Sequence, residues 1–253
     1  MEDLTERARF DAEWGTQQAR SIVSARLDPA ESSRYLHPSR TMPYPLEYAF
    51  DLLGEVAGKH VLELGCGSGE NTVPLCQRGA HVLGIDVSSE LIALAKQRLR
   101  QAGLAAELKA GSEYALEIAD QSVDVIFCAS VMHHLNIAAA ASEMCRVLKP
   151  GGAVVLKEPI RFSEAYAALR NLLPARPAVS KYEHPLTRPE FESIAGMFAC
   201  DGLRYFRLPW VGVARRTSPS LPRPASRTDD RILGAFPFLS HFAPVAVVRL
   251  TQK

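Results

Sequence analysis

The stretch Val61-Leu62-Glu63-Leu64-Gly65-Cys66-Gly67-Ser68-Gly69 decides the fold of this 253-residue chain. Its first half is a short apolar run typical of a buried strand, and its second half is a glycine-rich turn. Where such a turn connects a strand to a helix, the free N–H groups of the helix start face the edge of the sheet at which ligands bind. The stretch therefore predicts a ligand-binding turn at the carboxyl end of a strand.

Short apolar runs and helical stretches alternate around this turn. The predicted strands are Val61–Leu64, His81–Ile85, Ala106–Lys109, Val123–Ala129 and Ala153–Leu156. The helices predicted between them are Asn71–Arg78, Ser89–Gln101 and Ile137–Leu148. Alternation of this kind, with continuously apolar strands, indicates a parallel sheet with helices on both faces.

The remaining segments are expected to add helices and two late strands. Residues 2–26 and Leu46–Glu55 have helical patterns, and Thr187-Arg188-Pro189-Glu190 is a capping box that opens a helix through Met197. Tyr205–Val213 and Val245–Leu250 are predicted strands. Between them, residues 217–230 are rich in Pro, Ser and Arg, which predicts a mobile surface loop.

The bulk composition is that of an ordinary globular protein, with 47% hydrophobic and 23% charged residues. A net charge of +1 provides no basic footprint for nucleic acid, so nucleic acid is not the expected partner. The five cysteines are scattered without zinc-ligand spacing, which favours a reducing compartment and predicts no metal site. No run approaches the ~20 apolar residues of a membrane span, and we expect a cytoplasmic protein.

Three details narrow the ligand of the glycine turn. The spacing is G-x-G-x-G, whereas the dinucleotide fingerprint has its third glycine one place later, where this chain has Glu70. A negative charge on Glu63 would oppose a pyrophosphate but suits a cationic amino-acid group. Asp86 ends the next strand, about 20 residues on, where a carboxylate can accept hydrogen bonds from both ribose hydroxyls.

With these residues, the chain resembles the class I S-adenosylmethionine (SAM)-dependent methyltransferases. The resemblance lies in four segments with the family's order and spacing, namely Glu63–Gly69, Gly84–Ser88, Asp124–Leu135 and Leu148–Gly152. It implies a Rossmann-like, doubly wound α/β fold with a seven-stranded, mostly parallel sheet in the order three-two-one-four-five-seven-six, an antiparallel last strand and helices on both faces. It also implies one domain, comprising an N-terminal helical lid (1–56), a SAM-binding core (57–160), an acceptor-side helical segment (161–200) and a C-terminal strand pair (201–253).

The resemblance further implies roles for individual residues. Those expected to contact SAM are Glu63, Gly65, Cys66, Gly67, Asp86, Val87, Ser112, Glu113, Ala129 and Ser130. Glu63 would lie near the methionine amino group, Asp86 would hold the ribose and Val87 would flank the adenine. The family often places an acidic residue against the adenine amine, but the matching position here is Ser112, followed by Glu113. The position of this contact therefore stays open by one or two residues.

Three residues are candidates for catalysis on the acceptor side. His133 and His134 follow the fourth predicted strand, and Glu158 ends the fifth. Methyl transfer from a sulfonium is an in-line displacement, in which an acceptor hydroxyl can need a general base while an amine or thiolate can need only positioning. Each histidine could be that base or could pack on the following helix. Glu158 could bind substrate or hold its loop.

The expected function is transfer of the SAM methyl group to a small-molecule acceptor, which leaves S-adenosylhomocysteine (SAH). A methyltransferase acting on RNA or protein is the main alternative, although Ala129-Ser130-Val131-Met132 lacks the N/D-P-P-Y/F signature of amino-group methylation. A non-catalytic SAM-binding protein and a nicotinamide-dependent oxidoreductase are further alternatives, and the glycine spacing and Glu63 argue against the latter. The sequence identifies neither the acceptor atom nor the oligomeric state.

Overall fold

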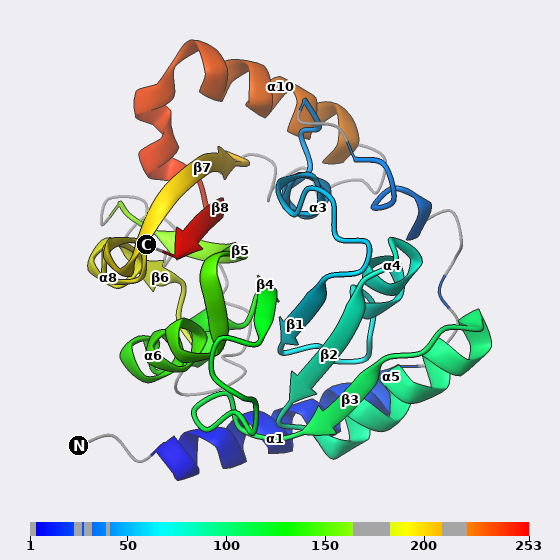
Figure 1. Cartoon of the computed structure of the whole chain (residues 1–253). Helices are drawn as coiled ribbons and strands as arrows, with labels where there is room; N and C mark the ends of the chain where they lie inside the picture. The colour runs from blue at the N-terminus through cyan, green and yellow to red at the C-terminus, as the bar shows by residue number, and fades with distance from the viewer. Residues whose placement is uncertain are drawn as a thin grey trace.

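The computed structural model describes residues 4–22, 27, 32–38, 41–163, 183–208 and 222–252. At its centre lies a sheet of eight strands, seven of them in the order β3-β2-β1-β4-β5-β8-β7 and the eighth, β6, beside β5 (Figure 1). Strands β1 to β5 run parallel, and β8 runs antiparallel to both of its neighbours. The predicted α/β class and strand order are confirmed, with the two-residue β6 as an addition.

Each strand is placed by its hydrophobic pattern. The strands are β1 His60–Leu64, β2 His81–Asp86, β3 Glu107–Ala110, β4 Val123–Ala129, β5 Leu148–Arg161, β6 Leu186–Thr187, β7 Phe198–Phe206 and β8 Val245–Gln252. Residues 61–64 of β1 and 245–248 of β8 are all buried. These continuous apolar runs suit strands that are paired on both edges and covered on both faces.

The helices lie around this sheet. They are α1 Leu4–Ser21, α3 Pro45–Leu52, α4 Thr72–Gln77, α5 Ser89–Ala102, α6 Ile137–Val147, α8 Arg188–Met197 and α10 Pro222–Ala235, with 3-10 turns η1 Met132–His134 and η2 Pro237–Phe242. Local signals set several ends. The side chain of Ser88 accepts a hydrogen bond from Leu91 N at the start of α5, Gly103 ends that helix in the left-handed region, and α8 begins with the predicted capping box.

Helices cover both faces of the sheet, and successive residues of β4 show this. Ile126 belongs to a buried cluster with Met144 of α6 and Ile194 of α8. Its neighbour Val125 belongs to a second cluster with Phe50 of α3. Because successive side chains of a strand point to opposite faces, the two clusters are the two halves of a doubly wound core.

Several predicted boundaries are wrong. Of the predicted loop 217–230, residues 222–230 form the first part of α10, and residues 217–221 lie outside the described residues. A proline is tolerated in a first helical turn, and Asp229 Oδ2 accepts a hydrogen bond from Leu208 N. Strand β7 ends at Phe206, and residues 209–213 of the predicted strand lie outside the described residues. Strand β5 extends beyond Ala153–Leu156, since its pairing with β8 continues to Pro159.

The predicted N-terminal helix corresponds to α1, and its residues 2–3 and 23–26 lie outside the described part of the chain. No helix within the described ranges is both long and apolar enough to cross a membrane.

Candidate active site

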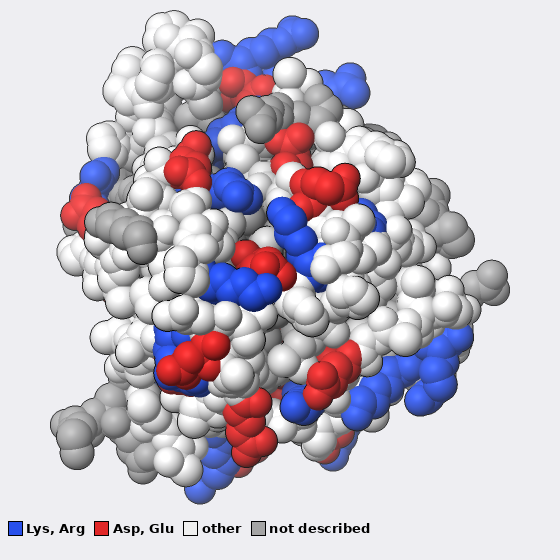
Figure 2. Space-filling model, viewed as in Figure 1, with Lys and Arg blue, Asp and Glu red and all other residues white. Residues whose placement is uncertain are grey.

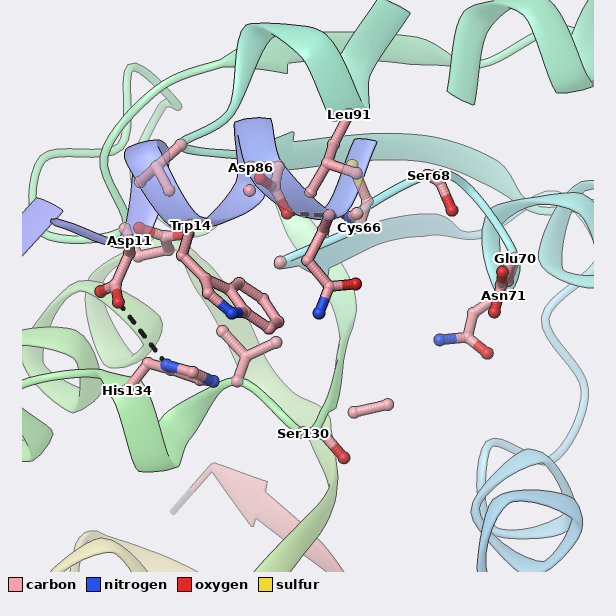
Figure 3. A pocket seen from close by; sticks show the side chains of 18 of the residues that line it. Asp11, Trp14, Cys66, Ser68, Glu70, Asn71, Asp86, Leu91, Ser130 and His134 are labelled. Carbon is pink, nitrogen blue, oxygen red and sulfur yellow. Dashed lines mark hydrogen bonds and ion pairs between the residues drawn. The ribbon is translucent and has the colours of Figure 1, made fainter. Parts of the chain in front are cut away.

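A pocket of about 420 Å³ lies at the carboxyl ends of β1, β2 and β4 (Figure 3). The glycine turn after β1, the end of β2 and the loop after β4 form one part of its wall. Helix α1 runs across this edge of the sheet (Figure 1), and the opposite wall is supplied by its residues Asp11, Trp14, Gly15 and Gln18 and by Ile22 directly after it. The pocket is therefore built by segments from both the N-terminal region and the central sheet.

The glycine turn brings its backbone close to the pocket. Gly65, Gly67 and Gly69 have φ angles of +63°, +53° and +81°, the left-handed region that other residues rarely adopt. A Cβ on Gly65 would lie 2.2 Å from Val131 Cγ2, so packing alone demands glycine there. At Gly67, nothing would lie within 4 Å of a Cβ. Gly67 thus borders open space, where a ligand can approach the main chain.

Asp86 connects this turn to the end of β2. Its Oδ2 accepts a hydrogen bond from Gly67 N at 2.9 Å, and its Oδ1 accepts one from Ser88 N at 2.9 Å. Burial raises the pKa of Asp86, although the two backbone hydrogen bonds oppose that rise. Since each carboxylate oxygen has a second lone pair, Asp86 can hold the turn and still accept hydrogen bonds from a ligand.

Glu63 lies in β1, behind the glycine turn, and is 1% exposed. Its Oε2 accepts a hydrogen bond from Thr72 Oγ1 at 2.6 Å, while its buried Oε1 has no hydrogen-bond partner among the residues that the structure describes. Burial raises the pKa of Glu63 to about 8, and the hydrogen bond from Thr72 opposes that rise. A cation placed beside Oε1 would favour the charged form of Glu63.

Glu113 and Ser112 differ in where they face. Glu113 lines the pocket and is 4% exposed, and burial raises its pKa to about 8. Ser112 is not among the pocket-lining residues, and its Oγ accepts a hydrogen bond from Tyr114 N at 3.2 Å. The acidic side chain therefore follows one position after the residue that the resemblance aligns.

The other residues expected to contact SAM also border the pocket. They are Gly65, Cys66, Gly67, Val87, Ala129 and Ser130. Burial raises the pKa of the Cys66 thiol, so this residue provides apolar packing rather than a reactive thiolate. Together with Asp86 and Glu113, the predicted residues thus form one surface, and only Glu63 and Ser112 lie outside its lining.

Glu158 holds the loop that follows β4. Its Oε1 accepts hydrogen bonds from Val131 N at 2.9 Å and Met132 N at 3.1 Å, and its Oε2 lies 2.9 Å from His133 Nδ1. Burial would raise the pKa of Glu158, but the hydrogen bond and charge of His133 and the amide of Val131 bring it below its ordinary value. Glu158 and His133 are both buried outside the pocket lining, which supports the loop-holding interpretation.

His134 is the one acceptor-side candidate that lines the pocket. Its ring lies 5.8 Å from the Trp14 ring between centroids, and its Nδ1 lies 3.5 Å from Asp11 Oδ1 (Figure 3). Arg7 Nε donates a hydrogen bond to the backbone carbonyl of His134. Helix α1 thus surrounds His134 with polar and aromatic groups.

Asp11 and Gln18 are pocket residues that the sequence did not single out. One signal for the position of α1 was available, because Gly15 interrupts an otherwise helix-favouring segment. A Cβ there would lie 2.5 Å from Ser88 Cβ, so glycine allows α1 to pack closely against the start of α5.

Comparison with known proteins agrees with the resemblance to methyltransferases that the sequence motifs indicated. Residues 61–152 match the family model described as methyltransferase domain. The chain is 30% identical over 167 residues to a ubiquinone biosynthesis O-methyltransferase of Aeromonas salmonicida, a match that covers 65% of each protein. It is 35% identical over 114 residues to the enzyme of that name from Pseudomonas aeruginosa, covering 44% of this chain and 49% of that protein. The chain thus matches about half to two thirds of the length of these relatives.

Solved structures share the fold at lower identity. Geranyl diphosphate C-methyltransferase from Streptomyces coelicolor has a TM-score of 0.63 at 16% identity, over 82% of this chain and 78% of that chain. The cyclase SpnF has a TM-score of 0.57 at 16% identity, over 81% and 80%. Since one of these neighbours is named a cyclase, they inform the architecture and leave the reaction to the site. By the family match, residues 61–152 form a methyltransferase domain, and the fold around them is shared with methyltransferases of known structure.

Proposed function

We propose that this chain transfers the methyl group of SAM to a small-molecule acceptor and releases SAH. The observation that carries the proposal is the contact between Asp86 Oδ2 and Gly67 N, which joins the glycine turn to the end of β2 inside one pocket. This arrangement presents a carboxylate and an exposed backbone to a single ligand at the carboxyl edge of a parallel sheet.

The donor set of the pocket fits SAM. Asp86 would accept hydrogen bonds from the ribose hydroxyls, and Glu113 would lie on the adenine side. The unpartnered Oε1 of Glu63 suits the methionine ammonium group, reached directly or through water. Two buried carboxyls whose pKa values are raised to about 8 favour a cationic ligand, since a nearby positive charge offsets the cost of ionising them.

SAM supplies a methyl group that its positive sulfur already activates, so the chain must align the acceptor and exclude water. We place the acceptor beside His134 and Ser130, which line the same pocket. Trp14 of α1 covers this end (Figure 3). His133 and Glu158 would act through the loop that they hold rather than by touching the acceptor.

A small organic molecule is the acceptor class that the surface favours. Basic and acidic side chains are interspersed over the face in Figure 2, without the continuous basic surface that a nucleic-acid backbone attracts. The curated relatives are named for O-methylation in ubiquinone biosynthesis, which makes small phenols and related hydroxyl compounds the first acceptors to test. We further propose that the reaction takes place in the cytoplasm.

Isothermal titration of the purified chain with SAM, SAH and NAD tests the proposal. We expect dissociation constants of about 1–100 μM for SAM and SAH and no binding of NAD. The protein is then incubated with SAM and panels of phenols, amines, thiols and quinols while SAH is quantified. Absence of SAM binding by the folded protein would overturn the cofactor assignment. Binding of SAM with no SAH formed from any acceptor class would instead support the non-catalytic alternative.

A further inference from the structure

A cluster of metal-ligating side chains lies directly beside the pocket. His133, His134 and Glu183 each offer one ligand atom, and these atoms all lie within 4.8 Å of one another. The histidines belong to η1, whereas Glu183 comes shortly before β6, so the fold rather than local spacing brings the three together. His134 connects the cluster to the pocket, because it also belongs to the pocket wall.

His133 lies between two carboxylates. Its Nδ1 is 2.9 Å from Glu158 Oε2, and its Nε2 is 3.8 Å from Glu183 Oε1. Glu158 Oε2 is placed to accept an N–H from Nδ1, the arrangement of a histidine that binds a metal ion through Nε2. Nε2 faces an oxygen of Glu183, and a metal cation between the two atoms would bind both.

His134 also faces a carboxylate. Its Nδ1 and the facing Asp11 Oδ1 are both buried, and neither has a hydrogen-bond partner among the described residues. Glu183 Oε2 is buried and unpartnered in the same way. Burying such polar atoms is costly unless something binds them.

The geometry of the cluster suits one ion. The rings of His133 and His134 have their centroids 4.2 Å apart, and Glu183 faces His133 Nε2. One divalent cation would accept a lone pair from each ring and from the Glu183 carboxylate at once.

We propose that His133, His134 and Glu183 bind a divalent transition-metal ion. Two imidazoles and one carboxylate form a donor set used for zinc and for non-haem iron, and it leaves positions free for a substrate. Glu158 has the place of the outer carboxylate that fixes the tautomer and orientation of a metal-bound histidine.

The location gives the ion a role that rests on the proposed function. An ion bound to His134 would lie at the acceptor end of the pocket, where an acceptor hydroxyl could coordinate it. Coordination lowers the pKa of a hydroxyl, so its proton can pass to solvent before the oxygen displaces the methyl group from sulfur. In that step the O–CH₃ bond forms as the S–CH₃ bond breaks, and SAH leaves with the electron pair of the broken bond.

Metal binding can be measured without SAM. The chain is treated with a chelator, dialysed against Zn²⁺ or Co²⁺, and analysed for metal content and for the visible absorption of bound Co²⁺. We expect one equivalent per chain. Glu183→Gln and His134→Gln should each lower the affinity at least about tenfold, and both variants should keep the circular dichroism of the parent.

Exposed His60 and His81 provide a matched control, because their rings lie 5.5 Å apart at the amino ends of β1 and β2. The double variant H60A/H81A should keep the bound equivalent. The proposal is overturned if the folded chain binds no metal, or if the equivalent is lost in H60A/H81A and retained in Glu183→Gln. A SAM titration of the metal-free chain separates this result from the proposed function, because the cofactor contacts do not include Glu183.

Discussion

Strands β2 and β5 each carry a buried carboxylate near their carboxyl ends, and each carboxylate accepts two backbone N–H groups of a loop. Asp86 does so for Gly67 and Ser88, and Glu158 for Val131 and Met132. The two side chains are 9% and 1% exposed, respectively. Asp86 borders the pocket, whereas Glu158 is enclosed by the loop that it holds.

The partner of each carboxylate explains the difference. His133 and the loop amides contact Glu158 and outweigh the effect of burial, so the pKa of Glu158 falls. Asp86 has no histidine or basic side chain within hydrogen-bond distance in the described residues, and burial raises the pKa of Asp86. A carboxylate whose hydrogen-bond partners all come from the protein holds the structure together. A carboxylate that still has a lone pair facing a pocket can bind a ligand. Position at a strand end does not distinguish the two cases.

Among the changes near Asp86, Gly67→Val should have the largest effect on ligand binding. A valine there would be strained at φ +53°, and its side chain would project into the pocket beside Asp86. We expect SAM binding to fall below detection by titration, while circular dichroism shows the sheet intact. Retained SAM affinity in this variant would remove the glycine turn from the site.

Glu158→Ala tests the structural role of Glu158 in holding the loop after β4. The change removes the acceptor of the loop amides and of His133, and we expect the free energy of unfolding to fall by about 3 kcal/mol. Urea denaturation followed by circular dichroism measures this. If stability is unchanged and only methyl transfer is lost, Glu158 is a catalytic residue after all.

Asp86→Ala is the matching change at the end of β2. We expect SAM affinity to fall by about 1.5–3 kcal/mol, or roughly 10- to 150-fold, because a charge-assisted hydrogen bond to the ligand is lost. Titration calorimetry measures the change, and SAH should lose affinity to a similar extent. Unchanged affinity in a folded variant would contradict the assignment of Asp86.

Stability should depend on pH through Glu63. Its pKa rises from an ordinary 4.5 to about 8 on folding, so the folded chain retains a proton that the unfolded chain releases in this interval. The contribution of Glu63 to stability is therefore complete below pH 4.5 and is lost as the pH rises toward 8, by at most about 1.4 kcal/mol per pH unit.

Urea unfolding at several pH values compares the parent chain with Glu63→Gln. The variant should show a shallower decline over this interval, while the exposed control Glu117→Gln should follow the parent. Equal slopes in all three proteins would mean that Glu63 is ionised throughout.

The smallest effect is expected at Ser112. Because Ser112 does not line the pocket, Ser112→Ala should change SAM affinity by less than about 0.5 kcal/mol. Glu113→Gln, measured in the same titration, should have the larger effect. The reverse order would place the adenine contact on Ser112.

Much of the sheet was predictable because its signals are local. The apolar runs around Val61 and Val123, the cap at Ser88 and the capping box at Thr187 each act within one turn or strand. The beginning of α10 was not predictable, since its proline-rich composition is that of a loop. A distant contact between Asp229 and Leu208 N helps to fix that helix.

The residues of the site also fall into a part that the sequence could predict and a part that it could not. The motif residues of the pocket follow the strand ends in sequence, so their convergence at one edge could be expected. The approach of Asp11 to His134, and of Glu183 to His133, depends on how segments far apart in the chain pack together. Nothing in the spacing of these residues indicates either contact.

The insertion of β8 between β5 and β7 has a consequence for how the chain is made. Strand β8 follows both of its partners, β5 and β7, in the sequence. During synthesis from the N-terminus, the edges of β5 and β7 that pair with β8 therefore stay unpaired until β8 is made. These long-range pairings form late, and the nascent chain is open to misassociation until they do. The last barrier to folding, and the need for a chaperone, should therefore lie at this junction rather than at the ligand-binding turn.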